Sequence, residues 1–280
     1  MAIITLCSAS GSPGVTTTAL GLALSWTRPV ILVEADPTGG SALLAGYLRG
    51  TTTPPDSLID LALAHREGSL EAAVPQVMMP LPGTSVMLIP GTRSHEQARS
   101  LVALWQPLTE VLRGLERTGQ DVIVDAGRLG LMGFPEPLMF GSDLTLLLTR
   151  SDLVSLSGAH SWAASLREDF AGVGVASSLG VAMVGQGDPY GPGEVARVLE
   201  VPVVATLAWD PEMAAVLSRG SDPPRPGVLH RLAGRSQVEE SGLWRSLRAA
   251  RTAVEDTITG NRARLEPGPI RRSRDEHRQP

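Results

Sequence analysis

Short aliphatic runs alternate with longer amphipathic segments along most of the chain. Each run has four to six residues, mostly Val, Ile and Leu, which is typical of strands buried in a sheet. The runs lie at 3–7, 30–34, 86–89, 122–125, 144–149, 179–184 and 203–207. Between them, polar and apolar positions follow the 3.6-residue period of a helix. The chain is therefore predicted to alternate strands with helices.

The intervening segments predict six helices. They cover 17–26, 57–66, 96–116, 154–170, 195–200 and 239–258, with a kink expected at Pro107. Strands that alternate with crossover helices predict an α/β fold: a doubly wound, mostly parallel sheet with helices on both faces.

The chain length of 280 residues suits one large α/β domain, which we place at residues 1–259. A stretch rich in Pro and Gly at 220–227 precedes the last predicted helix. Residues 260–280 contain six arginines and few apolar side chains, so this segment cannot bury enough surface to fold. We expect it to be a disordered, locally basic tail.

Composition narrows the class of protein. The net charge of −5 and the isoelectric point near 5.6 exclude a basic nucleic-acid-binding surface over the whole domain. All 24 basic residues are arginine, which excludes any mechanism that needs a lysine. The single cysteine, Cys7, excludes an internal disulfide and a cysteine metal cluster. The first basic residue is Arg28 and no apolar run reaches about 20 residues, so we expect a cytoplasmic protein without a secretory signal or a membrane span.

A loop of small residues follows the first predicted strand and leads into the first predicted helix. Its residues are Gly11, Ser12, Pro13, Gly14, Val15, Thr16 and Thr17. Glycines allow loop amides to converge on a phosphate, the helix N-terminus adds positive potential, and the Thr16 hydroxyl is placed to bind Mg²⁺. A phosphate-binding loop has a lysine where Val15 stands, so a glycine-rich turn that only starts the helix explains the pattern equally well.

Two carboxylates follow other predicted strands. Asp36 comes after strand 30–34, and Asp125 ends strand 122–125. The carboxyl ends of parallel strands share one edge of the sheet, so both carboxylates are expected beside the loop. Each also has a structural alternative, because Asp36-Pro37 is a common turn and Asp125 is suited to a cap or turn at a strand end.

These motifs resemble the MinD/ParA family of deviant Walker ATPases. The family loop reads Lys-Gly-Gly-x-Gly-Lys-Thr-Thr and matches 10–17, the Asp-x-Asp-Pro segment matches 34–37, and the Walker B strand matches 122–125. The segment 201–220 also resembles a late consensus of the family, and the resemblance covers about 1–258. It implies a P-loop NTPase fold that binds ATP or ADP with Mg²⁺ and forms a homodimer through the loop face.

The resemblance also assigns roles to individual residues. Residues 11–17 would hold the phosphates, and Asp36 would be the catalytic carboxylate. Thr16 would hold Mg²⁺, together with Asp36 and with Asp125, which acts through water.

Two departures from the family pattern concern chemistry. Val15 and Ser10 stand where the family has lysines, and a charge-assisted hydrogen bond contributes about 1.5–3 kcal/mol. We therefore expect ATP hydrolysis to be weak or absent. Arg128 is the candidate for supplying the missing positive charge and for contacting nucleotide, although an arginine at such a position is more often simply solvated. In place of the family's adenine-reading Asn, the chain offers Gln186 or Asp188, or a polar turn without a ligand.

Other conspicuous residues have structural explanations. The five histidines lack metal-ligand spacing. The five tryptophans lie on apolar faces or beside strands, so we expect core packing rather than base stacking: Trp26, Trp105, Trp162, Trp209 and Trp244. The last predicted helix is amphipathic, which suits a membrane-surface element or, as we favour, a helix packed on the domain.

The sequence thus predicts a nucleotide-binding positioning or assembly switch. Its protein partner would belong to a pilus, secretion or cell-division machine, and the missing lysines resemble the CpaE or TadZ branch that serves Tad-type pili. Peripheral contact with the inner face of the membrane fits this role. Alternatives are a pseudo-ATPase scaffold that no longer binds nucleotide and a chromosome- or plasmid-partitioning ATPase, although acidity disfavours DNA binding. A ligase similar to dethiobiotin synthetase is disfavoured by the missing lysines.

Overall fold

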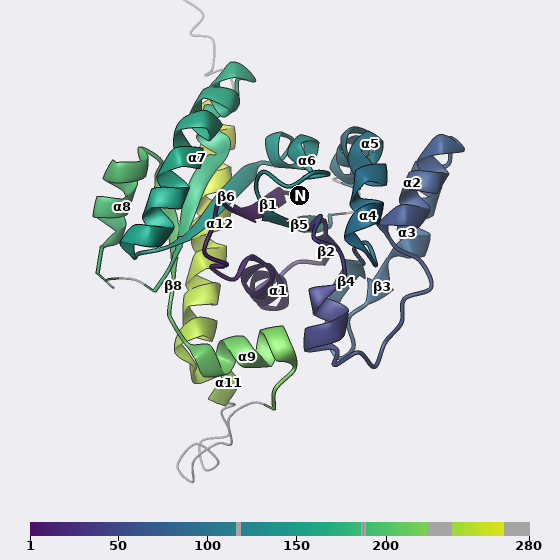
Figure 1. The fold of residues 1–280 in the computed structure, drawn as a ribbon, viewed down its shortest axis with the longest axis horizontal. Coiled ribbons are helices and arrows are strands. Elements are labelled where there is room, and N and C mark those ends of the chain that lie inside the picture. The colour runs from purple at the N-terminus through teal and green to yellow at the C-terminus, as the bar shows by residue number, and fades with distance from the viewer. Residues whose placement is uncertain (116–118, 186, 188, 223–236, 266–280) are drawn as a thin grey trace, which may run out of the picture.

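The computed structural model describes residues 1–115, 119–185, 187, 189–222 and 237–265. Its core is an eight-stranded sheet in the order β3-β4-β2-β5-β1-β6-β7-β8 (Figure 1). The strands are β1 (Ile3–Ser8), β2 (Val30–Glu34), β3 (Met79–Pro80), β4 (Val86–Ile89), β5 (Asp121–Arg128), β6 (Leu144–Arg150), β7 (Leu179–Val184) and β8 (Val203–Leu207). All neighbouring pairs are parallel except β3 with β4. The prediction of a mostly parallel sheet is confirmed.

Helices cover both faces of this sheet. They are α1 (Val15–Ser25), α2 (Leu58–Arg66), α3 (Leu70–Val77), α4 (His95–Ala98), α5 (Val102–Gly114), α6 (Glu136–Phe140), α7 (Leu153–Gly172), α8 (Pro192–Leu199), α9 (Pro211–Arg219), α11 (Gln237–Glu240) and α12 (Gly242–Leu265). One apolar core joins the sheet to residues of α2, α5 and α7, such as Leu61, Leu108 and Leu166. A second core on the opposite face joins it to α1, α9 and α12, through Leu20, Leu217 and Leu247. The doubly wound arrangement is therefore also confirmed.

The long helix predicted at 96–116 is interrupted, but the break is not at the expected residue. A 3-10 turn at Arg99–Leu101 separates α4 from α5, whereas Pro107 lies inside α5. Ala98 and Leu101 are both buried, and a 3-10 turn places residues three apart on one side of the backbone. Packing thus decides the position of the break.

Helices α3, α6 and α9 were not predicted from the sequence pattern. All three are short, and each contains or begins beside a proline, which weakens a helical signal. Their apolar faces are nevertheless buried, as at Val74, Leu138 and Met213. Tertiary burial compensates for weak local propensity.

Helix α12 packs on the domain along its whole apolar face. Leu247, Val254 and Ile258 are buried, and a Cβ atom placed at Gly21 of α1 would lie 2.5 Å from Leu247 Cδ1. The absence of a side chain at Gly21 therefore lets α1 and α12 approach closely. Two interpretations of this helix were open, a membrane-surface element and a helix packed on the domain, and the structure shows the second. No helix in the described ranges has both the length and the hydropathy that a bilayer span requires.

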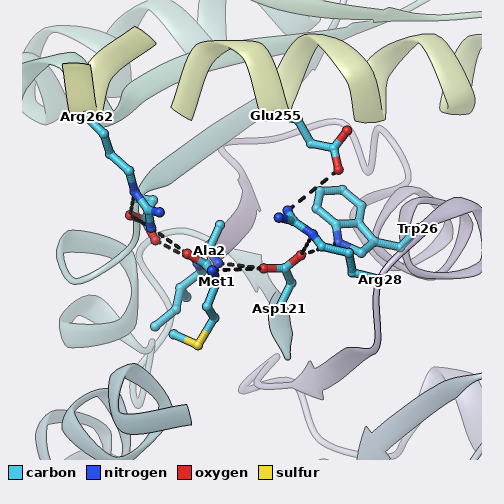
Figure 2. Close-up of polar contacts among 9 residues, drawn as sticks. Met1, Ala2, Trp26, Arg28, Asp121, Glu255 and Arg262 are labelled. Atoms are coloured by element: carbon cyan, nitrogen blue, oxygen red, sulfur yellow. Dashed lines mark hydrogen bonds and ion pairs between the residues drawn. The ribbon is translucent and has the colours of Figure 1, made fainter. Parts of the chain in front are cut away.

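The end of α12 corrects the predicted start of the tail. Residues 260–265 are helical rather than disordered, because polar contacts fasten them to the domain. Arg262 Nη2 donates to the backbone oxygen of Met1 and to Asp143 Oδ1, at 2.6 Å each (Figure 2). Asn261 Nδ2 donates to the Ser177 oxygen at 2.6 Å. Tail residues 266–280, with Arg271, Arg272, Arg274 and Arg278, lie outside the described residues, as do 223–227 of the segment rich in Pro and Gly.

A buried carboxylate joins several elements at the amino end of the sheet. Asp121, at the start of β5, is fully buried and accepts hydrogen bonds from Ala2 N at 2.6 Å and from Trp26 Nε1 at 2.7 Å. Arg28 Nε lies 2.7 Å from Asp121 Oδ2, and Arg28 Nη2 lies 3.6 Å from Glu255 of α12 (Figure 2). This network connects β1, β5, the end of α1 and α12.

Candidate functional site

The loop between β1 and α1 has a backbone conformation that favours glycine. Gly11, Ser12 and Gly14 have φ angles of 75°, 44° and 95°, in the left-handed region. Gly14 precedes the first residue of α1, and that helix start has neither a side-chain cap nor an acidic residue in its first turn. Its first amides and its positive potential are therefore left for a ligand.

Helix α7 supports this loop from one side. A Cβ atom at Gly158 would lie 2.1 Å from Ser10 Oγ, and a Cβ atom at Gly11 would lie 3.1 Å from Ser155 Oγ. The Ser155 hydroxyl donates to Asp152 Oδ2 at 2.8 Å, at the N-terminus of α7. The loop thus packs directly against α7, and this close contact requires small residues on both the loop and the helix.

The three predicted Mg²⁺-site residues converge at one place. Thr16, at the start of α1, lies close enough to the Asp125 carboxylate to lower the pKa of that carboxyl, and both residues line one cavity. Gly127 is close to both Asp36 and Asp125. Its amide donates to Asp125 Oδ1 at 3.1 Å, and a Cβ atom added at Gly127 would lie 2.2 Å from Asp36 Cγ. A small cavity of about 30 Å³ is lined by these residues and by Glu34.

Asp125 is the electrostatic centre of this cluster. Its side chain is 1% exposed, and its Oδ2 has no hydrogen-bond partner within the described part of the chain. Burial, followed by the nearby charges of Asp36 and Glu34, raises the pKa of Asp125 to about 7, although hydrogen bonds from Thr16 and Gly127 oppose the shift. A cation or a proton at this point would relieve the repulsion.

Glu34 is a site residue whose role the sequence pattern does not reveal. It is 4% exposed at the end of β2, where its Oε1 accepts from Leu43 N and its Oε2 from Gly91 N, at 3.2 Å each. Burial is the main cause that raises its pKa. Its position opposite Asp125 in the parallel ladder places a third carboxylate beside the cluster.

Val15 and Arg128 occupy contrasting environments around the loop. Val15 is 7% exposed and belongs to the core under α1. Arg128 is exposed at the end of β5, opposite Ser8 in the ladder, and the next residue donates its amide to the Ser8 oxygen at 2.8 Å. Arg128 therefore belongs to β5 at the point where its neighbour β1 leads into the loop.

A hollow of about 860 Å³ lies at the carboxyl ends of β6, β7 and β8. The guanidinium of Arg150 lies 4.4 Å from the centre of the Trp209 ring, and both residues line the hollow. Asp152, which also lines it, is one turn of α7 before the loop contact Ser155. The hollow and the loop are therefore neighbours along one edge of the sheet.

Trp209 corrects the expectation that all five tryptophans pack in the core. It is 58% exposed because it follows the end of β8 rather than lying within it. Trp26 and Trp105 are buried, and Trp162 and Trp244 are partly buried against the two cores. The sequence signal for the hollow was a tryptophan two residues after the end of an aliphatic run. Gln186 and Asp188, the expected base contacts, lie outside the described residues.

Comparison with known proteins gives matches to solved structures. No protein-family model matches the chain, and no curated protein sequence does. The cell division ATPase MinD of Pyrococcus furiosus is 22% identical, with a TM-score of 0.64 over 91% of this chain and 98% of that one. MinD of Pyrococcus horikoshii, complexed with Mg-ADP, is 19% identical, with a TM-score of 0.65 over 93% of this chain and 98% of that one.

A third match is a solved structure of a ParA family protein. A ParA family ATPase of Chlorobium tepidum is 16% identical, with a TM-score of 0.65 over 90% of this chain and 98% of that one. Each of the three matches covers at least 90% of this chain. The chain thus has the fold of the MinD/ParA ATPases.

Proposed function

We propose that the chain is a nucleotide-binding assembly switch that hydrolyses ATP weakly or not at all. The observation that carries the proposal is the buried Asp125 carboxylate. Its Oδ2 has no hydrogen-bond partner among the described residues, and it lies beside Thr16 at the uncapped N-terminus of α1. An unpartnered oxygen on a buried carboxylate is costly unless a ligand satisfies it. ADP with Mg²⁺ is a ligand of P. horikoshii MinD, which has the same fold.

The residues present fit a nucleotide with its cation. Loop amides of residues 11–17 would hold the phosphates, and Thr16 would bind Mg²⁺ directly. The described residues form no group of three or more His, Cys, Asp or Glu side chains suited to a metal ion. Phosphate oxygens and water would therefore complete the coordination, with Asp36 and Asp125 acting on the bound water.

The hollow at the strand ends would take the base. Arg150 and Trp209 present a cationic plane and an aromatic ring, and stacking of a base on an aromatic side chain contributes about 1–3 kcal/mol. Nucleotide would then extend from this hollow across the start of α7 to the loop.

Val15 supplies the first test. Val15→Lys is expected to tighten ATP binding about tenfold or more, because it adds a charge-assisted hydrogen bond worth about 1.5–3 kcal/mol. Titration calorimetry with Mg-ATP measures this, and Val15→Met is the control of similar length without charge. Equal affinities of the two variants would contradict a phosphate site in the loop.

Phosphate release by the unchanged protein is expected to be far slower than by Val15→Lys, and the opposite order would contradict weak hydrolysis.

A scaffold that binds no nucleotide is the second candidate, and the buried Val15 in place of a lysine favours it. The same calorimetry separates the two, since a scaffold would show no heat of binding with ATP or ADP. Either form would position a partner from a pilus, secretion or cell-division machine, with peripheral membrane contact. The net charge of −5 disfavours DNA partitioning.

The loop edge is also the proposed homodimer surface. Leu153 and Val154, at the start of α7 beside the loop, are 66% and 82% exposed. Exposed apolar residues next to small loop residues suit close approach of a second copy. We therefore place the dimer contact on the loop, on the turn at Asp36 and around Arg128.

Ser12→Arg is expected to weaken this dimer at least about tenfold by inserting bulk and like charge into the contact. Ser12 is preferable to Gly14 because a φ of 95° at Gly14 would strain any side chain there, whereas Ser12 already has one. Analytical ultracentrifugation with and without Mg-ATP measures the change, with the exposed Thr252→Arg of α12 as control. A monomeric parent protein under both conditions would overturn the dimer.

A further inference from the structure

An apolar groove of about 800 Å³ lies between α6, α7 and the loop that follows β5. Its lining includes the aromatic side chains of Phe134, Phe140 and Trp162. At its borders, Met132 and Val173 are 65% and 58% exposed. Exposed apolar residues around a hollow mark a surface that another segment can cover.

The charge of the groove has one sign. Its charged lining residues, among those the structure describes, are Glu136, Glu168 and Asp169. An apolar floor with an acidic border is complementary to a segment that combines apolar and basic side chains.

The groove ends where helix α12 ends. Phe140, the last residue of α6, lines the groove three residues before Asp143, the partner of Arg262. Val173, directly after α7, lines it four residues before Ser177, the partner of Asn261. The last turns of α12 are thus fastened beside the ends of both helices that form the walls (Figure 1).

The chain that continues from this point has the complementary chemistry. Residues 270–274 read Ile-Arg-Arg-Ser-Arg, while the acidic residues Glu266, Asp275 and Glu276 flank them. Residues 270–274 therefore combine three positive charges with one apolar side chain, that of Ile270. Ile270 comes five positions after Leu265, and this stretch spans up to about 17 Å when extended, which brings the segment within reach of the groove.

The opposite end of the groove leads to the candidate nucleotide site. The loop 129–134 follows directly from Arg128, and a Cβ atom at Gly130 would lie 2.9 Å from the Trp162 ring. Trp105 Nε1 donates to the Gly133 oxygen at 2.9 Å. A segment that covers Trp162 would therefore also contact the loop that begins at the Asp125 strand.

We propose that residues 270–274 of the same chain dock in this groove, with Ile270 on the aromatic floor and the arginines on Glu136, Glu168 and Asp169. The docked segment holds loop 129–134 in place and excludes other basic partners from the groove. This autoinhibitory contact goes beyond the proposed nucleotide function and does not depend on it.

Disulfide trapping in the full chain tests the contact. Cys7 gives little background, because burial raises the pKa of its thiol to about 12 and shields it. Ser273→Cys is combined with Met132→Cys in the groove or with the control Val198→Cys, which is 51% exposed on α8. Under mild oxidation at low protein concentration, the groove pair is expected to close at least about tenfold faster than the control pair.

Charge variants of the groove pair complete the test. Replacing Arg271, Arg272 and Arg274 by Glu is expected to slow closure to the rate of the control pair, whereas replacing them by Lys is expected to preserve most of it. Circular dichroism establishes that each variant is folded. Equal rates for groove and control pairs, or no effect of charge reversal, would overturn the proposal. A disulfide-linked dimer as the main product would do so as well, because the groove would then bind the tail of a second copy.

Discussion

Asp121→Ala is expected to lower the free energy of unfolding by about 3–5 kcal/mol, because it removes the acceptor from a buried, charged hydrogen-bond network. Two donors, Ala2 N and Trp26 Nε1, would lose their partner, and Arg28 would lose its ion pair. Each donor left unsatisfied in a buried position carries a desolvation cost of about 1–3 kcal/mol. Urea unfolding followed by circular dichroism measures the loss.

A matched control is the exposed pair of Arg49 and Asp222. These side chains are 56% and 89% exposed, so Asp222→Ala is expected to change stability by no more than about 1 kcal/mol. If Asp121→Ala also changed stability by only that amount, the network at the amino end of the sheet would not stabilise the fold.

Asp125→Asn is expected to increase the stability of the ligand-free protein at pH 8 by about 2–4 kcal/mol. Burial and two neighbouring carboxylates raise the pKa of Asp125 from 3.8 to about 7 in the folded protein. The folded state therefore keeps a proton that the unfolded state has released, and stability falls as the pH rises from about 4 to about 7. Asparagine removes this penalty and can still accept from the Gly127 amide.

The pH profile distinguishes this effect from a general gain in stability. Below pH 3.8 the carboxyl is protonated in both states, so variant and parent should differ little there, and the difference should grow until about pH 7. Asp256→Asn, which makes the same change of charge at an exposed position of α12, is the control variant. A gain that is equal at all pH values would contradict the assignment to Asp125.

The same variant is expected to lose function. The proposed Mg²⁺-nucleotide site needs the carboxylate of Asp125, so Asp125→Asn should weaken Mg-ATP binding while it stabilises the ligand-free fold. Buried charge that destabilises a fold is retained where a ligand uses it. Titration calorimetry with Mg-ATP on parent and variant at pH 8 measures the loss of affinity. Undiminished affinity of the variant would contradict the proposal that Asp125 helps to hold Mg²⁺.

The sequence by itself determined the sheet and the location of the candidate site. Seven aliphatic runs are strands, because short segments of Val, Ile and Leu bury best between two helical layers. The parallel order then requires residues after strand ends to meet at one edge, so the convergence of Thr16, Asp36 and Asp125 followed from their positions along the chain.

Tertiary structure alone decided the remaining features, because they depend on contacts between residues far apart in the sequence. Trp209 is exposed beside Arg150 since β8 ends before it, a property that its apolar neighbours do not reveal. The helical end of α12 depends on Asp143 and Ser177, more than 80 residues away. Burial also sets the pKa of Asp125, and neither periodicity nor composition encodes how deeply a strand end is covered.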